Sequence, residues 1–237
     1  MQIFIKTALV ITTKRNDILK IVSIVPIKLN NERLPQKNTK LLGDKPLINY
    51  ICDTLLSVDM IDGRFVYCSS KEICKYTPNG IIFLKRPEYL DLPTSNFTQI
   101  FSEFSNVVNA DIYIYAHATA PFIKKETIVS AVKAVASGEY DSAFCAQRLQ
   151  DFIWSNGEPL NFSSENLPRS QDLPVYYRET SGVYVFTKKV FEKYKRRIGI
   201  NPFIVEVGYK EAVDVNTFED FKLAEHFITY KEDDTGV

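Results

Sequence analysis

The sequence predicts an α/β protein whose single domain is built on a mostly parallel sheet covered by helices on both faces. Short apolar runs rich in β-branched and aromatic residues alternate with helical patterns along the chain. The strand-like runs are apolar throughout, as expected for strands buried on both faces. A chain of 237 residues with 45% apolar residues is also long enough to bury one full core.

The first expected strand is apolar, ends at Pro26 and leads into a loop without helical period, residues 28–40, called here the basic loop. Asn30 and Asn31 tolerate turn conformations, and Pro35 stiffens the far side. The basic loop carries four cations: Lys28, Arg33, Lys37 and Lys40. A constrained backbone that displays four cations is suited to hold an anion.

The elements after the basic loop alternate between helix and strand. Helical stripes of apolar residues are expected over 47–56, 97–108 and 128–135, and strands over 64–68, 81–84, 111–116, 182–186 and 203–207. A closing helix starts at Thr217, where Thr217 and Asp220 form a variant of a capping box.

The periodic pattern breaks between residues 151 and 180. Turns and short extended pieces replace it, and a long irregular stretch in a compact domain is usually functional or an interaction arm. The stretch carries five aromatic residues with too little periodicity to bury them in one subunit: Phe152, Trp154, Phe162, Tyr176 and Tyr177. We therefore expect a homodimer interface there.

Composition limits the partners that the chain can attract. Basic and acidic side chains balance at 29 each, so no global positive field exists to draw in nucleic acid. The four cysteines show no CxxC spacing, which favours buried thiols in a reducing cytoplasm over disulfides. Neither histidine has partners at the spacing of a nucleophilic triad, so hydrolase chemistry of that kind has no support.

The first 20 residues stand apart from the globular pattern. Residues 3–13 are apolar, but Lys6 interrupts them, they are too short to cross a bilayer, and no cleavage site of small residues follows. We expect no membrane association. The expected division is an N-terminal extension over 1–20 (an added strand, an extension or a misassigned start), one domain over 21–230 and a tail over 231–237.

The basic loop and the helix start after it carry an ordered set of residues that identifies a family. This set is Pro26, Lys28, Asn31, Arg33, Pro35, Lys37, Asn38, Lys40, Gly43, Lys45, Pro46, Leu47 and Ile48. It resembles the signature of the acylneuraminate cytidylyltransferases, which activate sialic-acid-like sugars as CMP conjugates. The set lacks the G-x-x-x-x-G-K-[ST] and G-x-G-x-x-G patterns, which disfavours a Walker ATPase or a dinucleotide-binding domain. The resemblance covers roughly residues 21–230 and implies a Rossmann-like, three-layer nucleotidyltransferase domain with a dimerisation arm over 151–180.

The resemblance implies a CTP site on the basic loop. Lys28, Arg33 and Lys37 are expected to hold the phosphates, with Lys28 and Lys37 as catalytic cations. Asn31 and Asn38 are expected to fix the loop or the nucleotide. The segment Lys85-Arg86-Pro87-Glu88 follows a strand end and is similar to the family's Arg-Pro-Glu, so the resemblance also assigns Arg86 to CTP.

A magnesium site is expected near the C-terminus. Asp214 and Asn216 occupy alternating positions of an expected short strand, 212–216, and would share a face. The family commonly places two Asp residues here to hold Mg²⁺, and this chain has Asn at the second. One or two carboxylates suffice for Mg²⁺ when substrate phosphates and waters complete the octahedron. Asp214 is thus a third catalytic candidate, although the residues alone equally allow a local backbone cap.

Two segments are implied to bind a sugar acid. His117 and Thr119 follow a strand end and resemble the family's Gln-Pro-Thr-Ser-Pro segment, with His117 assigned to substrate contact rather than proton transfer. Arg169 and Gln171 resemble the family's Arg-x-Gln-Asp. The carboxylate of a sugar acid needs a fork-shaped donor, which favours Arg169, and a solvated or subunit-bridging arginine is the alternative.

The resemblance therefore implies a cytoplasmic, homodimeric enzyme that joins CMP from CTP to the anomeric hydroxyl of a nonulosonic acid. One alternative is a cytidylyltransferase for an eight-carbon 3-deoxy sugar acid. A glycosyltransferase is a second, although the chain has no mid-chain Asp-x-Asp. A third is a non-catalytic nucleotide-binding relative, motivated by departures from the family pattern at Lys28, Asn31, Ser69, Pro93 and Asn216.

Overall fold

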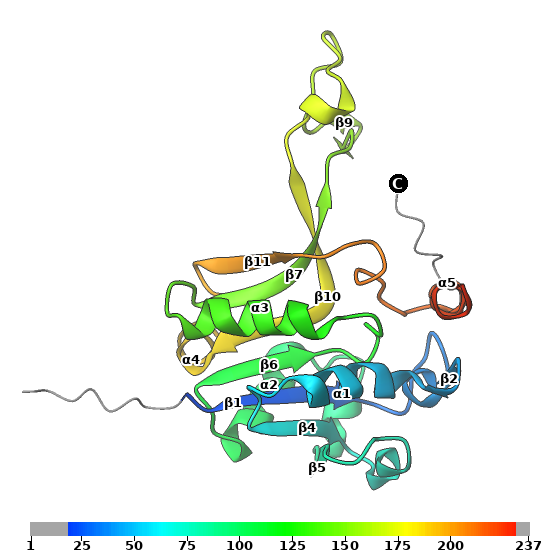
Figure 1. Ribbon diagram of the computed structural model, residues 1–237, viewed down its shortest axis with the longest axis vertical. Coiled ribbons are helices and arrows are strands. Elements are labelled where there is room, and N and C mark those ends of the chain that lie inside the picture. The colour runs from blue at the N-terminus through cyan, green and yellow to red at the C-terminus, as the bar shows by residue number, and fades with distance from the viewer. Residues whose placement is uncertain (1–18, 231–237) are drawn as a thin grey trace, which may run out of the picture.

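A seven-stranded sheet forms the middle layer of this computed structural model, which describes residues 19–230 (Figure 1). The strand order is β11-β7-β10-β6-β1-β4-β5. The strands are β1 Ile21–Ile27, β4 Gly63–Cys68, β5 Ile82–Lys85, β6 Ile112–Ala116, β7 Ser142–Leu149, β10 Tyr176–Thr187 and β11 Pro202–Glu206. Within this sheet only β10 is antiparallel to its neighbours. The carboxyl ends of the other six strands therefore share one edge.

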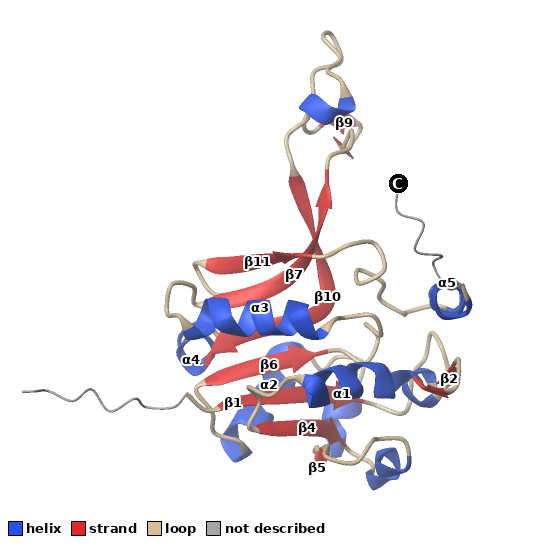
Figure 2. Ribbon diagram, viewed as in Figure 1, coloured by secondary structure: helices blue, strands red, loops and turns tan. Residues whose placement is uncertain are grey.

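Helices cover both faces of the sheet, so the expected α/β class and mostly parallel sheet are confirmed (Figure 2). The helices are α1 Leu47–Ser57, α2 Phe97–Val107, α3 Lys125–Ala136, α4 Lys188–Tyr194 and α5 Phe218–Thr229. An aliphatic cluster that includes Ile51 and Val132 joins one face to α1 and α3. An aromatic cluster that includes Phe101 and Phe191 joins the other face to α2 and α4, with those two rings 4.6 Å apart.

Strand β1 shows how the apolar run serves both layers. Val25 and Ile27 join the aliphatic cluster, whereas Val22 and Ile24 join the aromatic cluster. The expectation that Pro26 ends the strand is wrong, because β1 continues to Ile27. Strand β6 pairs with β1 only as far as Ile24, so Pro26 lacks a neighbour on that side and its missing N–H is tolerated.

Other differences from the expected elements lie in the second half of the chain. The sequence patterns missed β7 and α4, and the expected strand over 212–216 is an extended segment outside the sheet. Three of the four free cysteines are buried as expected, but Cys74 is exposed. The expected extension over 1–20 and tail over 231–237 lie outside the described residues, apart from Leu19 and Lys20.

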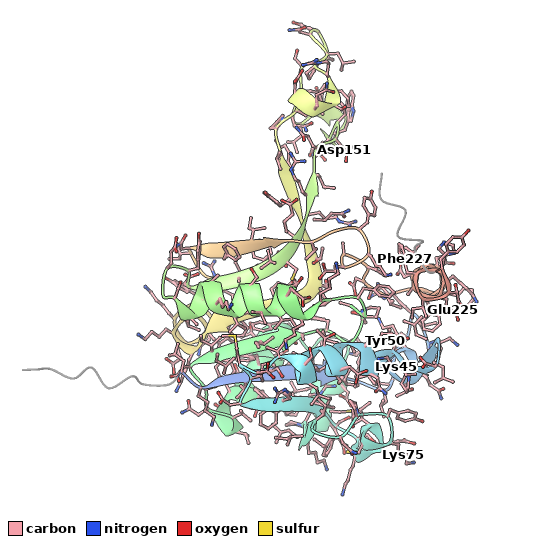
Figure 3. The ribbon with its side chains drawn as sticks, viewed as in Figure 1. Lys45, Tyr50, Lys75, Asp151, Glu225 and Phe227 are labelled. Atoms are coloured by element: carbon pink, nitrogen blue, oxygen red, sulfur yellow. The ribbon has the colours of Figure 1, made fainter. Side chains whose placement is uncertain are left out.

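Strands β7 and β10 continue past the sheet as a two-stranded ribbon that carries a projecting arm, residues 150–175 (Figure 1). The arm contains the short strands β8 Trp154–Ser155 and β9 Glu158–Pro159, and Asp151 marks its base (Figure 3). Irregular structure ends at Val175 rather than at Thr180, because β10 starts at Tyr176. Trp154 is 58% exposed, so much of the arm's aromatic surface is uncovered in one chain.

Helix α5 is packed beside the basic loop by a third apolar cluster. Leu34 of the loop, Val215 and Phe221 belong to this cluster, and Tyr50 of α1 and Phe227 of α5 pack against it (Figure 3). The predicted capping box at the start of α5 is present. In residues 19–230 no helix combines the length and apolar character needed to span a bilayer.

Candidate active site

The basic loop is cross-linked at the carboxyl end of β1. Asn38 Nδ2 donates to the carbonyl oxygen of Lys28 at 3.0 Å and to Oδ1 of Asn31 at 3.5 Å. The expected loop-fixing role of these two asparagines thus has contacts in the structure. Their contact with a nucleotide stays a prediction.

Two cations of the basic loop meet one amide from the far end of the chain. Lys37 Nζ and Arg33 Nη2 both donate to Oδ1 of Asn216, each at 3.3 Å. Lys37 is only 8% exposed. Burial lowers its pKa, Asp214 opposes this effect, and Arg33 adds to it. The Lys37 ammonium is therefore poorly hydrated and well placed to gain from an anionic ligand.

Lys28 belongs to the same group of charges. It is near enough to Lys37 to contribute to the lowering of that pKa. With Asn31, Arg33 and Lys37 it lines a cavity of about 270 Å³ at the surface of the loop. The structure therefore brings together the expected phosphate-binding side chains around one hollow.

Asp214 and Asn216 lie on one side of the segment that precedes α5. Val213 and Val215 point into the third apolar cluster, and the Val215 N–H donates to the Thr119 carbonyl at 2.7 Å. The side chains of this segment therefore alternate between two sides as they would in a strand, although the segment belongs to no sheet. Asn216 Nδ2 donates to Asp214 Oδ2 at 2.7 Å.

The donor set around Asp214 fits a magnesium ion. Asp214 Oδ1 is buried and has no hydrogen-bond partner among the described residues. This oxygen therefore lacks the hydrogen bond that normally offsets the cost of burying a polar atom. No group of three or more His, Cys, Asp or Glu side chains suited to a metal occurs in residues 19–230. Mg²⁺ does not need three or more protein side chains, because it takes most of its ligands from phosphates and water.

His117 and Thr119 are placed at the carboxyl end of β6, next to the Asp214 segment. The His117 ring lies 5.2 Å from the ring of Tyr115 and 6.2 Å from that of Tyr184, measured between centroids. Its Nε2 is buried without a partner among the described residues. Burial, reinforced by the positive charge of Arg197, lowers the pKa of His117 to about 4. The imidazole is therefore neutral at pH 7, and its Nε2 is left without a partner from the described residues.

Arg86 has a protein partner in the structure. Its side chain is buried, its backbone N–H donates to the Cys68 carbonyl, and its guanidinium forms an ion pair with Asp91. Asp91 also accepts a hydrogen bond from Ser69 Oγ. The Nε of Arg86 has no partner within residues 19–230. The assignment of Arg86 to CTP stays a prediction that rests on the family resemblance.

Arg169 and Gln171 are not brought to the basic loop. Both lie in the arm, where Arg169 donates to both carboxylate oxygens of Asp172, at 2.7 and 3.1 Å. The Gln171 carbonyl accepts from Gln150 Nε2 at 2.9 Å. The polar contacts of these residues in the described chain are therefore local to the arm.

The sequence patterns missed a cavity of about 400 Å³ beside Asp214. Its polar lining comes from β10 and the approach to α5: Arg178, Glu179, Thr180, Ser181, Tyr209 and Asp220. The available signal was the polar run Arg178-Glu179-Thr180-Ser181, which directly precedes the apolar run 182–186.

Comparison with known proteins identifies relatives over most of the chain. The model of the family described as Cytidylyltransferase matches residues 22–233. N-acylneuraminate cytidylyltransferase A of Danio rerio is 24% identical over 222 residues, which cover 90% of this chain and 51% of that protein. The 3-deoxy-manno-octulosonate cytidylyltransferase of Acaryochloris marina is 23% identical over 249 residues, which cover 89% and 98%. The chain thus spans about half the length of the N-acylneuraminate relatives.

A solved structure shows the same fold. The CMP:2-keto-3-deoxy-manno-octonic acid synthetase complexed with CTP superposes with a TM-score of 0.67 at 17% identity, covering 89% of this chain and 98% of that one.

Proposed function

This chain belongs to the cytidylyltransferase family, and from that premise we propose that it transfers CMP from CTP to the anomeric hydroxyl of a nonulosonic, sialic-acid-like sugar acid and releases pyrophosphate. The relatives named N-acylneuraminate cytidylyltransferases support the nine-carbon acceptor. The basic loop supports the nucleotide half of the reaction.

The observation that carries the proposal is the contact between the two ends of the domain. Lys37 and Arg33, which follow β1, both reach Asn216, which precedes α5 and bonds to Asp214. Asn216 thereby bridges the two cations and a carboxylate that has an open oxygen. Few structural roles need such a pairing, whereas a metal-bound triphosphate needs both.

The basic loop supplies the electrostatic part of the mechanism. In the reaction the anomeric oxygen forms a bond to the α-phosphorus while the bond to pyrophosphate breaks, and negative charge develops on the phosphate oxygens. Lys28, Arg33 and Lys37 are already in place, so they stabilise this charge without reorganisation during the reaction. The scheme needs no covalent enzyme intermediate.

Asp214 and Asn216 would hold Mg²⁺. When bound, the ion neutralises phosphate oxygens as a Lewis acid. Asp214 Oδ1 would be the open ligand atom. Asn216 Oδ1 would be a second ligand atom if phosphates accepted the hydrogen bonds that Lys37 and Arg33 now donate to it.

The sugar acid is assigned to the carboxyl end of β6 and to the arm. His117 offers an open, neutral nitrogen, and Thr119 is tied by its carbonyl to the Asp214 segment. Arg169 and Gln171 lie in an arm whose aromatic residues are exposed in one chain. We propose a homodimer in which this surface is covered and Arg169 reaches the carboxylate of the sugar acid.

A second candidate acceptor is an eight-carbon 3-deoxy sugar acid. The relative from Acaryochloris marina that carries that acceptor in its name is matched over 98% of its length, as is the structurally similar synthetase. The N-acylneuraminate relatives, by contrast, are matched over about half. Relatives named for both acceptor classes match this chain, and the basic-loop pattern favours the nine-carbon class.

Pyrophosphate release tests the proposal. The full chain is incubated with CTP, Mg²⁺ and either nine-carbon or eight-carbon sugar acids. We expect release with the nine-carbon acids, and a preference for eight-carbon acids would establish the second candidate. CTP binding without release on either class would overturn the enzymatic proposal in favour of a nucleotide-binding relative.

A further inference from the structure

A compact charged cluster lies on the α2 and α4 face of the sheet, next to His117. It consists of Arg197, from the loop after α4, and Tyr184 and Glu179 of β10. The Arg197 guanidinium carbon is 3.6 Å from the centroid of the Tyr184 ring, and Arg197 Nη2 donates to the Tyr184 hydroxyl at 2.9 Å. That hydroxyl donates to Glu179 Oε1 at 2.5 Å. Stacking and two hydrogen bonds fix the orientation of the cluster.

The cluster keeps unused hydrogen-bonding groups. The polar contacts of Arg197 within the described chain all use Nη2, including an ion pair with Glu179 Oε1 at 3.6 Å, so Nε and Nη1 stay available. Glu179 Oε2 likewise accepts no bond from residues 19–230. The side chains of Arg197 and Glu179 are 27% and 45% exposed. A ligand can therefore reach free donors and a free acceptor side by side.

The cluster adjoins the site of the proposed reaction. Glu179 lines the cavity of about 400 Å³ that Asp214 also lines. The His117 ring, whose Nε2 is buried and open, faces Tyr184 at 6.2 Å. The charge of Arg197 contributes, after burial, to the lowered pKa of His117, as expected for close neighbours. An acceptor with its reacting hydroxyl near Asp214 would meet Glu179 in this cavity, and Arg197 is the ion-pair partner of Glu179.

We propose that Arg197 and Glu179 are specificity-determining residues that bind a neutral polar substituent of the sugar acid, one that offers an acceptor and a donor together. This inference rests on the proposed function. An ion pair has no net charge, so it gives little attraction to the carboxylate of the sugar acid, which Glu179 repels. An acylamido group or two neighbouring hydroxyls satisfies Arg197 and Glu179 at once. A deoxy analogue leaves both without a ligand partner.

The test compares two sugar acids that differ only in this substituent. With CTP and Mg²⁺, the full-length wild type should favour the substituted acid over its deoxy analogue by about tenfold or more in kcat/KM. Arg197→Met should reduce the preference to about threefold or less and leave KM for CTP unchanged. Glu179→Gln, which keeps size and shape, should also lower it. Separate measurements with an acid that carries an acylamido group and with an acid that carries two neighbouring hydroxyls identify which group is bound.

Arg196→Met is the matched control, because Arg196 stacks on Tyr194 and donates to the Gly199 carbonyl, away from the cluster. It should keep the wild-type preference. An unchanged preference in both Arg197→Met and Glu179→Gln, or equal rate losses on both acids, would overturn the inference.

Binding separates this inference from the proposed function. Calorimetric titration of the two acids in the presence of CDP needs no turnover. Selective binding of the substituted acid that Arg197→Met removes would support the cluster even if the wild type released no pyrophosphate, an outcome that overturns only the catalytic proposal. Equal binding of the two acids by the wild type, or no binding of either, would overturn the cluster's role.

Discussion

The basic-loop edge and the arm differ in how many of their stabilising contacts come from the rest of the same chain. At the basic-loop edge, residues separated by more than 170 positions are hydrogen-bonded, as Lys37 and Arg33 are to Asn216. In the arm, Arg169 bonds to Asp172 three residues away, and Trp154 is 58% exposed. Long-range contacts fix the first region within a single chain. Among the described residues, the side-chain hydrogen bonds that Arg169 and Gln150 donate stay within the arm, and Trp154 leaves apolar surface uncovered.

This difference assigns separate roles to the two regions. A site for phosphate transfer needs charges held in position before substrate arrives, since reorganisation would raise the barrier. A region that acquires its partner from outside the chain needs the opposite, an exposed surface. We therefore expect substitutions at the basic-loop edge to change the chemical step. Substitutions in the arm should change acceptor binding and assembly.

The largest expected effect is that of Asp214→Ala, which should abolish Mg²⁺-dependent turnover. Asp214 carries the open carboxylate oxygen near the loop cations, and its loss removes an anionic ligand for the metal. Circular dichroism should show a folded protein. Pyrophosphate release measured across an Mg²⁺ titration checks the result.

Asn216→Asp is the companion variant for the metal site. A second carboxylate should raise activity or tighten the dependence on Mg²⁺ if Asn216 is a weak ligand. Should both variants respond to Mg²⁺ as the wild type does, Asp214 is a backbone cap and the metal assignment is wrong.

Lys37→Ala should lower kcat/KM by on the order of a hundredfold, since removing one charge directed at the developing phosphate charge costs a few kcal/mol. Lys40→Ala is the matched control, because Lys40 is exposed and lies over the Phe221 ring instead of near Asn216. Steady-state kinetics with CTP should leave the Lys40 variant within about threefold of wild type. Near wild-type kinetics for the Lys37 variant would mean that the loop serves another anion.

Sequence patterns predicted those parts of the fold and site whose signal is local. The apolar run of β1, the stripes of α1 to α3 and the Thr217 capping box each occupy a few neighbouring residues, and each was found. Strand β7 was missed because it begins Ser142-Ala143 and contains Gln147, so it lacks the β-branched run of a typical buried strand. Pairing with β10 and β11 makes it a strand, and pairing is not local.

The same limit applied to the candidate site. The basic loop is contiguous and was predicted residue by residue, whereas Arg197 approaches Tyr184 and Glu179 only because β10, α4 and the following loop fold back on the sheet. Nothing within a short window distinguishes Arg197 from Arg196. Asn216 and Lys37 were assigned separately, to the metal and to the phosphates, and their hydrogen bond was found only in the structure.

Arg169→Ala tests whether the arm takes part in binding the sugar acid. It should raise KM for the sugar acid by about tenfold, with KM for CTP nearly unchanged, because a charge-assisted bond to one substrate is lost. Asp172→Ala, which frees Arg169 from its local ion pair, is a useful counterpart and should not weaken sugar binding. An unchanged sugar KM in Arg169→Ala would show that Arg169 has no role in acceptor recognition.

Mixing subunits tests whether the arm serves a second chain. If the sugar site combines the core of one subunit with the arm of another, reassembled mixtures of Lys37→Ala and Arg169→Ala chains contain some intact sites. Random pairing of two chains in a two-fold dimer would restore up to about a quarter of wild-type activity. Light scattering that shows an active monomer, or mixtures no more active than their components, would contradict the dimer.

The smallest expected effect concerns stability. Thr217→Ala removes the side chain that accepts from the Asp220 N–H at the start of α5, and loss of such a cap costs about 1 kcal/mol of unfolding free energy. Asp220 Oδ2 also accepts from the Asn216 N–H at 2.9 Å, so the cap helps to hold the segment that carries Asp214 and Asn216. The arm offers the matched control Ser163→Ala, which removes only an acceptor for the exposed Glu165 N–H at 3.3 Å and should change stability by less than about 0.5 kcal/mol. Denaturant unfolding of the two variants measures the difference. Equal losses would mean that the arm is as tightly coupled to the folded core as the basic-loop edge, which would remove the contrast between the two regions.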